Sequence, residues 1–159
     1  MKRTIASLAI AIPLVFAVSA QARSGASESI NTVIPAPSFP SAPPYVEALT
    51  GSFTATGAFN DSGAISAQAL FAAVPSPSVS AFETVRTLTD AQGYTLTLRC
   101  SSFANDFSIL SDVPDRGTCA VHGGTGPYAS LSGSGKLTGF GDLTASPEIL
   151  NETVVIPAG

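Results

Sequence analysis

The strongest constraint on the fold of this chain is an alternation of apolar and polar residues with a period of two. Within residues 94–100, the even positions hold Tyr, Leu or Cys and the odd positions hold Thr or Arg. Such a pattern is typical of a β-strand with one buried face. No segment keeps a 3.6-residue apolar period over three turns, so the sequence predicts little helix beyond one short turn at 127–131.

The same pattern recurs along the chain between clusters of turn-forming residues, such as those at 60–63 and 89–93. Seven or eight short strands with Gly, Pro, Asn and Asp between them indicate an antiparallel barrel or a β-sandwich. Glycines at 133, 135 and 139 lie at even spacing and favour the strong coiling that barrel closure needs. The predicted fold class is therefore an all-β, antiparallel eight-stranded β-barrel, with the β-sandwich as the alternative. The predicted strands are 53–59, 65–74, 79–88, 94–100, 103–110, 118–122, 131–140 and 152–156.

Residues 1–22 have the pattern of a secretory signal peptide. Lys2 and Arg3 precede an apolar run over 5–18, which ends in the small-x-small sequence 20–22. The run has about fourteen residues, too few to cross about 30 Å of hydrocarbon as a helix. The sequence predicts cleavage after Ala22, a secreted or periplasmic location and no stable membrane insertion after cleavage.

A Pro-rich leader is predicted to follow the signal peptide, over residues 23–48. The segment 35–44 holds five prolines in ten residues, which favours an extended, polyproline-like backbone. Nothing before Tyr45 is expected to join a core. The barrel domain is therefore predicted to cover 49–159.

Two cysteines, Cys100 and Cys119, enclose eighteen residues. An exported protein meets an oxidising compartment, so we predict that these cysteines form a disulfide. In the loop-entropy description, such a bond stabilises the fold by about 3 kcal/mol. Two free thiols or a redox pair are the alternatives, but the chain has no C-x-x-C spacing.

Charge is scarce in this chain, at 11% of residues, and the formal net charge is −4. After removal of Lys2 and Arg3, five basic residues remain against eleven acidic ones, a net charge of −6. This balance argues against a nucleic-acid partner. One His and two Cys cannot supply a four-ligand zinc site, and the sequence predicts no metal and no cofactor. Asp106, Asp112 and Asp115 are expected to form a solvated acidic loop.

The candidate catalytic residues are His122, Glu83 and Arg99. His122 is the only histidine and lies beside a Gly-rich turn at a predicted strand end. Glu83 and Arg99 lie on predicted strands, where a charge facing the lumen would have a shifted pKa and could act on a ligand. The alternatives are an ordinary strand-end histidine and a cross-strand surface ion pair. Because adjacent residues point to opposite faces, only one of Arg99 and Cys100 can face inward.

The candidate ligand contacts are Tyr128, Phe82 and Leu96. Tyr128 lies in the Gly-rich segment 123–135, where it is expected to plug one end of the barrel together with Leu131. The rival interpretation of this segment is an anion-binding turn of backbone N–H groups. The match to a nucleotide-binding loop fails, because Ser130 and Leu137 stand at positions that the motif reserves for other residues.

Residues 123–135 read G-G-T-G-x-Y-x-x-L-x-G-x-G, after T-A-T-G at 54–57, D-S-G at 61–63 and T-L-T-L-R at 95–99. This order resembles small bacterial proteins related to the allene oxide cyclase and dirigent barrels, over roughly residues 49–156. The resemblance implies an eight-stranded barrel with a lumen, often assembled as a homo-oligomer. Some members of that group cyclise or isomerise apolar, oxygenated small molecules, and others direct the coupling of phenolic radicals. The likeness lies in scaffold glycines, so no catalytic residue is carried over from it.

Three functions follow as expectations. The first is a secreted barrel that binds a small apolar ligand in its lumen, and the second is a cyclase or isomerase that acts on an apolar, oxygenated small molecule there. The third is a structural component of the cell envelope. An inward-facing ionisable group is the feature that would favour the enzyme over the passive carrier.

Overall fold

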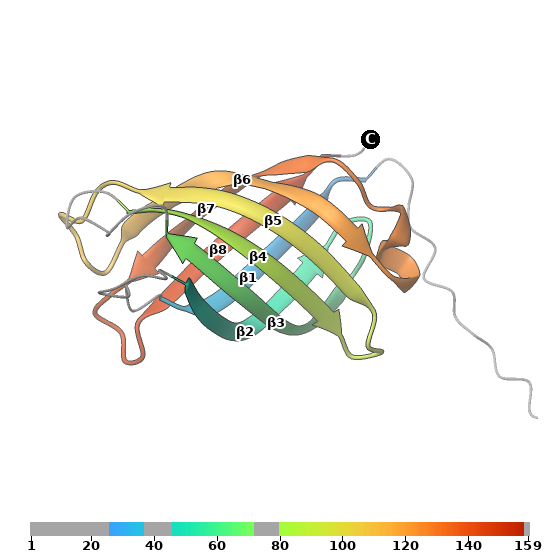
Figure 1. Ribbon diagram of the computed structural model, residues 1–159, viewed down its shortest axis with the longest axis horizontal. Helices are drawn as coiled ribbons and strands as arrows, with labels where there is room; N and C mark the ends of the chain where they lie inside the picture. The colour runs from blue at the N-terminus through green and yellow to red at the C-terminus, as the bar shows by residue number, and fades with distance from the viewer. Residues whose placement is uncertain (1–25, 37–45, 72–79, 158–159) are drawn as a thin grey trace, which may run out of the picture.

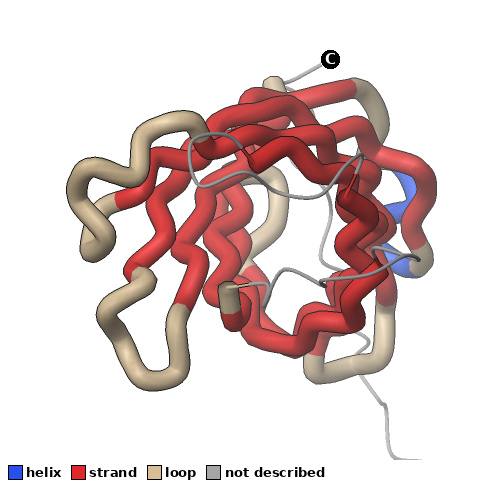
Figure 2. Tube along the Cα trace, turned by 60° about the vertical axis from the view of Figure 1, so that its left-hand side comes forward, coloured by secondary structure: helices blue, strands red, loops and turns tan. Residues whose placement is uncertain are grey.

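The computed structural model describes residues 26–36, 46–71 and 80–157, which form a closed antiparallel barrel (Figures 1 and 2). Each strand pairs with its neighbours in the sequence, and β1 pairs with β8 to close the cylinder. The predicted eight-stranded barrel is therefore confirmed. Its elements are β1 (Glu28–Pro35), β2 (Val46–Thr56), β3 (Asp61–Phe71), β4 (Ser80–Asp90), β5 (Thr95–Ala104), β6 (Val113–Gly124), the 3₁₀-helix η1 (Gly126–Ser130), β7 (Ser134–Asp142) and β8 (Ile149–Ile156).

Strand β1 corrects the predicted domain boundary. The leader was expected to stay outside the core, yet β1 pairs with β8 from Glu28↔Ile156 to Pro35↔Ile149. Its inward face buries Ile30 and Ile34 but also the polar residues Glu28 and Thr32. The strand therefore lacks the alternation of apolar and polar residues by which the other strands were predicted. The prediction that nothing before Tyr45 joins the core is therefore wrong, and the barrel begins at residue 28.

The predicted strand at 103–110 is also wrong. Strand β5 continues to Ala104, and residues 105–112 form an exposed connection to β6. Strand β1, which was not predicted, replaces the strand expected at 103–110, so the barrel still has eight strands. The predicted signal peptide and most of the proline run lie outside the described residues. No helix in the described parts of the chain has the length and hydropathy to cross a membrane.

The two ends of the barrel differ. At the turn end, which carries the β2–β3 and β4–β5 turns, η1 brings Tyr128 inward, as the sequence predicts. The Tyr128 ring meets Phe59 edge-on, with 5.2 Å between centroids, and its hydroxyl donates to Asp61 Oδ2 at 2.8 Å. At the opposite end, here called the loop end, residues 105–112 and 143–148 connect the strands. Tyr128 thus helps to close the turn end.

A disulfide joins Cys100 and Cys119 on the inner face of the barrel, with an S–S length of 2.04 Å. The two cysteines stand directly opposite each other on β5 and β6. The predicted pairing is confirmed in this structure, and the bond is compatible with an extracellular or periplasmic location. Cys100 faces inward and Arg99 faces outward, as strand alternation requires.

Candidate functional site

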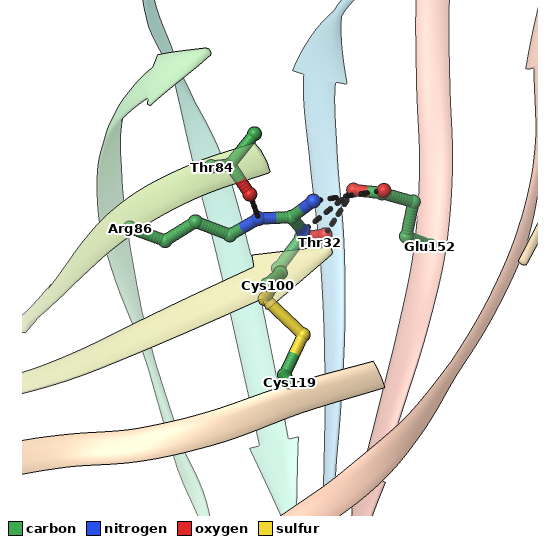
Figure 3. Close-up of polar contacts among 6 residues, drawn as sticks. All are labelled: Thr32, Thr84, Arg86, Cys100, Cys119 and Glu152. Atoms are coloured by element: carbon green, nitrogen blue, oxygen red, sulfur yellow. Dashed lines mark hydrogen bonds and ion pairs between the residues drawn. A yellow bond between two sulfur atoms is a disulfide. The ribbon is translucent and has the colours of Figure 1, made fainter. Parts of the chain in front are cut away.

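A group of polar side chains is buried between apolar layers inside the barrel. Four of its six members lie on β1, β4 and β8, and the other two lie on β5 and β6. All six are at most 5% exposed. We call this group the interior polar cluster; Figure 3 shows its Thr32, Thr84, Arg86 and Glu152 beside the disulfide. The cluster comprises Thr32, Thr84, Arg86, Ser102, Asp115 and Glu152.

A two-pronged ion pair between Arg86 and Glu152 spans the barrel interior (Figure 3). Arg86 Nη1 donates to Glu152 Oε2 at 2.7 Å, and Nη2 donates to Oε1 at 2.9 Å. Both side chains are fully buried. The planar guanidinium suits this paired geometry, which fixes both side chains.

Two threonines form further hydrogen bonds with the Arg86–Glu152 ion pair. Arg86 Nε donates to Thr84 Oγ1 at 2.8 Å, and Thr32 Oγ1 donates to Glu152 Oε2 at 3.3 Å. The guanidinium and the carboxylate therefore have partners beyond each other. Such partners are needed because two charges removed from water lose several kcal/mol of hydration each.

Asp115 brings a second carboxyl group next to Glu152. The strand register runs from Asp115 on β6 to Gly139 on β7 and on to Glu152 on β8. A Cβ atom at Gly139 would lie 2.8 Å from Glu152 Cα and would also meet the carbonyl oxygen of Asn151. Because Gly139 has no side chain, nothing on β7 separates the two carboxyl groups.

The two carboxyl groups have opposite pKa shifts. Burial and, after it, the adjacent Glu152 carboxylate together raise the pKa of Asp115 to about 8, against the opposing effects of Arg86 and Ser102. Burial alone would raise the pKa of Glu152, but Arg86 together with the neighbouring Asp115 and Thr32 outweighs burial and holds this pKa below its usual value. At neutral pH the pair therefore consists of a protonated Asp115 and an ionised Glu152.

Three oxygen atoms of the cluster lack a hydrogen-bond partner within the described residues. They are the Ser102 hydroxyl and both carboxyl oxygens of Asp115. Buried polar atoms are nearly always paired in native proteins, and an unpaired one costs about 1–3 kcal/mol. These atoms therefore mark the point where the cluster can still bind another group.

Apolar side chains of the loop end adjoin these oxygen atoms. Phe82 stands directly opposite Ser102 on β4 and β5, and Val113 precedes Asp115 on the same face of β6. The rings of Phe71 and Phe82 lie 5.7 Å apart. A neutral polar group set against aromatic and aliphatic walls is the usual lining of a small-molecule site.

The predicted catalytic residues lie on the outside of the barrel. Arg99 Nη2 and Glu83 Oε2 form an ion pair at 2.9 Å, with side chains 63% and 50% exposed. This is the surface pair that was the alternative interpretation. His122 is exposed and does not line the shallow groove of about 320 Å³ that contains Glu83 and Arg99.

The predicted ligand contacts are all buried on the inner side, but the structure divides them between the two ends. Phe82 adjoins the interior polar cluster at the loop end. Leu96 begins the inward face of β5 at the turn end, the end that Tyr128 closes. Only Phe82 of the three therefore adjoins the cluster.

Sequence reasoning missed the interior cluster as a site. Asp115 was expected in a solvated loop, which is wrong: it lies on the inward face of β6 and is 2% exposed. Strand parity alone could have indicated Arg86, which shares a face with Phe82 and Leu88. The same parity places Glu152 with the apolar residues of β8.

A second acidic group lies at the turn end, around Tyr128. Glu28 Oε2 accepts a hydrogen bond from the Phe59 amide at 2.9 Å, and burial raises the pKa of Glu28 to about 6. Asp90 Oδ1 accepts hydrogen bonds from two amides of the β4–β5 turn. These contacts fix turns, and no group of three potential ligands in the described ranges is arranged to hold a metal ion.

The raised pKa of Asp115 predicts a pH-dependent stability. The unfolded chain releases this proton near pH 4 and the folded chain near pH 8, so the stabilisation that Asp115 brings is complete below pH 4 and is lost as the pH rises to about 8. The Asp115→Asn variant is neutral throughout and should become more stable relative to wild type over this interval, by at most about 1.4 kcal/mol per pH unit. Urea unfolding of both proteins from pH 4 to 9 measures the difference. A constant difference across the interval would contradict the assignment.

No protein-family model, curated protein or solved structure matches this chain. The fold is therefore known from its own strand topology. Its function has to be argued from the chemistry of its sites, because a barrel fold by itself assigns no activity.

Proposed function

We propose that this chain is an exported barrel protein that binds a small, uncharged and mostly apolar molecule in its interior. The observation that carries the proposal is the group of three unpartnered buried oxygen atoms of Ser102 and Asp115. An oxygen atom of the ligand would accept a hydrogen bond from the Ser102 hydroxyl, with protonated Asp115 beside it. The apolar body of the ligand would pack against the loop-end side chains, including Phe82.

The charges of the cluster favour a neutral ligand. Arg86 is already satisfied by Glu152 and Thr84, so the interior polar cluster, as the structure describes it, has no free cation to bind an anionic group. The ionised Glu152 beside Asp115 would repel a carboxylate or phosphate. A ketone, alcohol or ether oxygen on a hydrophobic skeleton fits these conditions, in line with the apolar, oxygenated ligands that the family resemblance implies.

Removal of the Ser102 hydroxyl tests the proposal. We expect wild-type protein purified from its own host to carry a small molecule that native mass spectrometry detects and organic extraction releases. The Ser102→Ala variant should bind the molecule about tenfold more weakly and retain clearly less of it, down to about a tenth where the site is far from saturation, because one hydrogen bond to a buried neutral partner is worth about 1.4 kcal/mol. Ser101→Ala is the matched control, since Ser101 is the adjacent, outward-facing residue of the same strand.

Two outcomes would overturn the proposed function. One is wild-type protein that carries no small molecule, and the other is equal loading of wild type and Ser102→Ala. In either case an ordered water would satisfy the unpaired oxygens. The structural envelope role would then remain.

A cyclase or isomerase is a second candidate. Asp115 and Glu152 place a protonated and an ionised carboxyl group side by side, which is the arrangement that acid–base catalysis uses. In this interpretation Asp115 gives a proton to the ligand, and the exposed His122 and Glu83 take no part. If the bound molecule is converted, Asp115→Asn should abolish turnover while His122→Ala and Glu83→Ala retain it; the reverse pattern would exclude Asp115.

A further inference from the structure

A groove with a volume of about 500 Å³ lies on the outer face of β1, β7 and β8. The groove is also bordered by three residues of the inward-facing positions of these strands, Thr32, Gly139 and Glu152. The side chains of Thr32 and Glu152 point into the barrel and not into the groove. The groove is thus separate from the interior site. We call it the outer groove; the side chains used below are Asn31, Asp112, Thr138, Phe140, Asn151 and Thr153.

The outer groove contains an aromatic ring and one exposed aliphatic side chain, Val33, among polar side chains. Phe140 is 41% exposed and stands directly opposite Asn151 on β7 and β8. The ring lacks a partner from the ring pairs of the described residues. It is therefore available as a flat apolar platform at the surface.

Hydrogen-bonding groups surround this ring. Thr153 Oγ1 donates to Asn31 Oδ1 at 2.7 Å, which leaves both amide hydrogens of Asn31 unused. In the part of the chain that the structure describes, the side chains of Asp112, Thr138 and Asn151 form no hydrogen bond to protein. Donors and acceptors are thus present together in one groove, without a lysine or arginine among the lining residues.

We infer that the outer groove binds a neutral saccharide. A sugar hydroxyl both donates and accepts hydrogen bonds, which matches amide and hydroxyl side chains, and the C–H face of a pyranose ring packs on an aromatic ring. A phosphorylated, sulfated or uronic saccharide would find no cation and would meet the carboxylate of Asp112. A purely apolar ligand would cover the amides without pairing them, at a cost in free energy.

Titration with defined oligosaccharides tests this inference. The probes are maltohexaose, cellohexaose, xylohexaose, mannohexaose and chitohexaose, each titrated to 10 mM by ¹H–¹⁵N NMR. We expect saturable shifts of the Phe140 and Asn151 amides with at least one probe. Phe140→Ala should weaken binding of that probe at least tenfold, and Asn151→Ala at least fivefold.

Two control variants make the test specific. Phe103 is also an aromatic residue on the outer face and is 44% exposed, but it lies outside the groove, so Phe103→Ala should bind as wild type does. Ser102→Ala should also bind normally, because the interior site is separate. The inference is overturned if no probe binds, if Phe140→Ala binds like wild type, or if Phe103→Ala loses as much affinity as Phe140→Ala.

Discussion

Replacing Arg86 with alanine is expected to lower the free energy of unfolding by about 3–5 kcal/mol. The substitution leaves the Glu152 carboxylate buried without its charged partner and without the two hydrogen bonds that the guanidinium donates. It also removes a large side chain from a packed interior. Urea unfolding at pH 7, followed by circular dichroism in the β-sheet region, measures the loss.

The exposed ion pair of the same barrel supplies the matched control. Arg99→Ala removes an arginine from a pair that faces solvent, and it should cost less than about 1 kcal/mol. The double variant Arg86→Met/Glu152→Leu should be more stable than Arg86→Ala, since it leaves no unpaired charge. Equal losses for Arg86→Ala and Arg99→Ala would show that the Arg86–Glu152 pair is not buried in solution.

Loss of the disulfide is expected to cost about 3 kcal/mol in the loop-entropy description, for a sequence separation of 19. The Cys100→Ala/Cys119→Ala variant and reduced wild type should unfold at similarly lowered urea concentrations. Because the two sulfurs lie inside the barrel, reduction should need partial unfolding and should be slow without denaturant. A midpoint that does not change on reduction, or two titratable thiols in native protein, would contradict the bond.

Alternation was sufficient to predict the fold class because most inward faces are apolar. It failed at β1, where Glu28 and Thr32 alternate with Ile30 and Ile34 on the buried face. Those polar residues have partners on other strands: Glu28 accepts from the Phe59 amide and Thr32 donates to Glu152. The sequence pattern of a single strand cannot reveal hydrogen-bond partners that lie elsewhere in the chain.

The candidate site was harder to predict for the same reason. The alternation of inward and outward residues along a strand could place Arg86 and Glu152 inside the barrel. They are 66 residues apart, however, and only closure of the barrel brings them into contact. The approach of Asp115 to Glu152 depends further on register across Gly139. Glu83 and Arg99 attracted attention as charged strand residues, but the structure gives them an exposed cross-strand contact.

The pairing of the first strand with the last also has a consequence for biosynthesis. The ladder between β1 and β8 cannot form until residues 149–156 have been synthesised, so the cylinder stays open until β8 has left the ribosome. Contacts between such distant segments also make folding slow. A polypeptide that closes this late would remain unfolded long enough to be threaded through a secretion channel, as the predicted amino-terminal secretory segment requires.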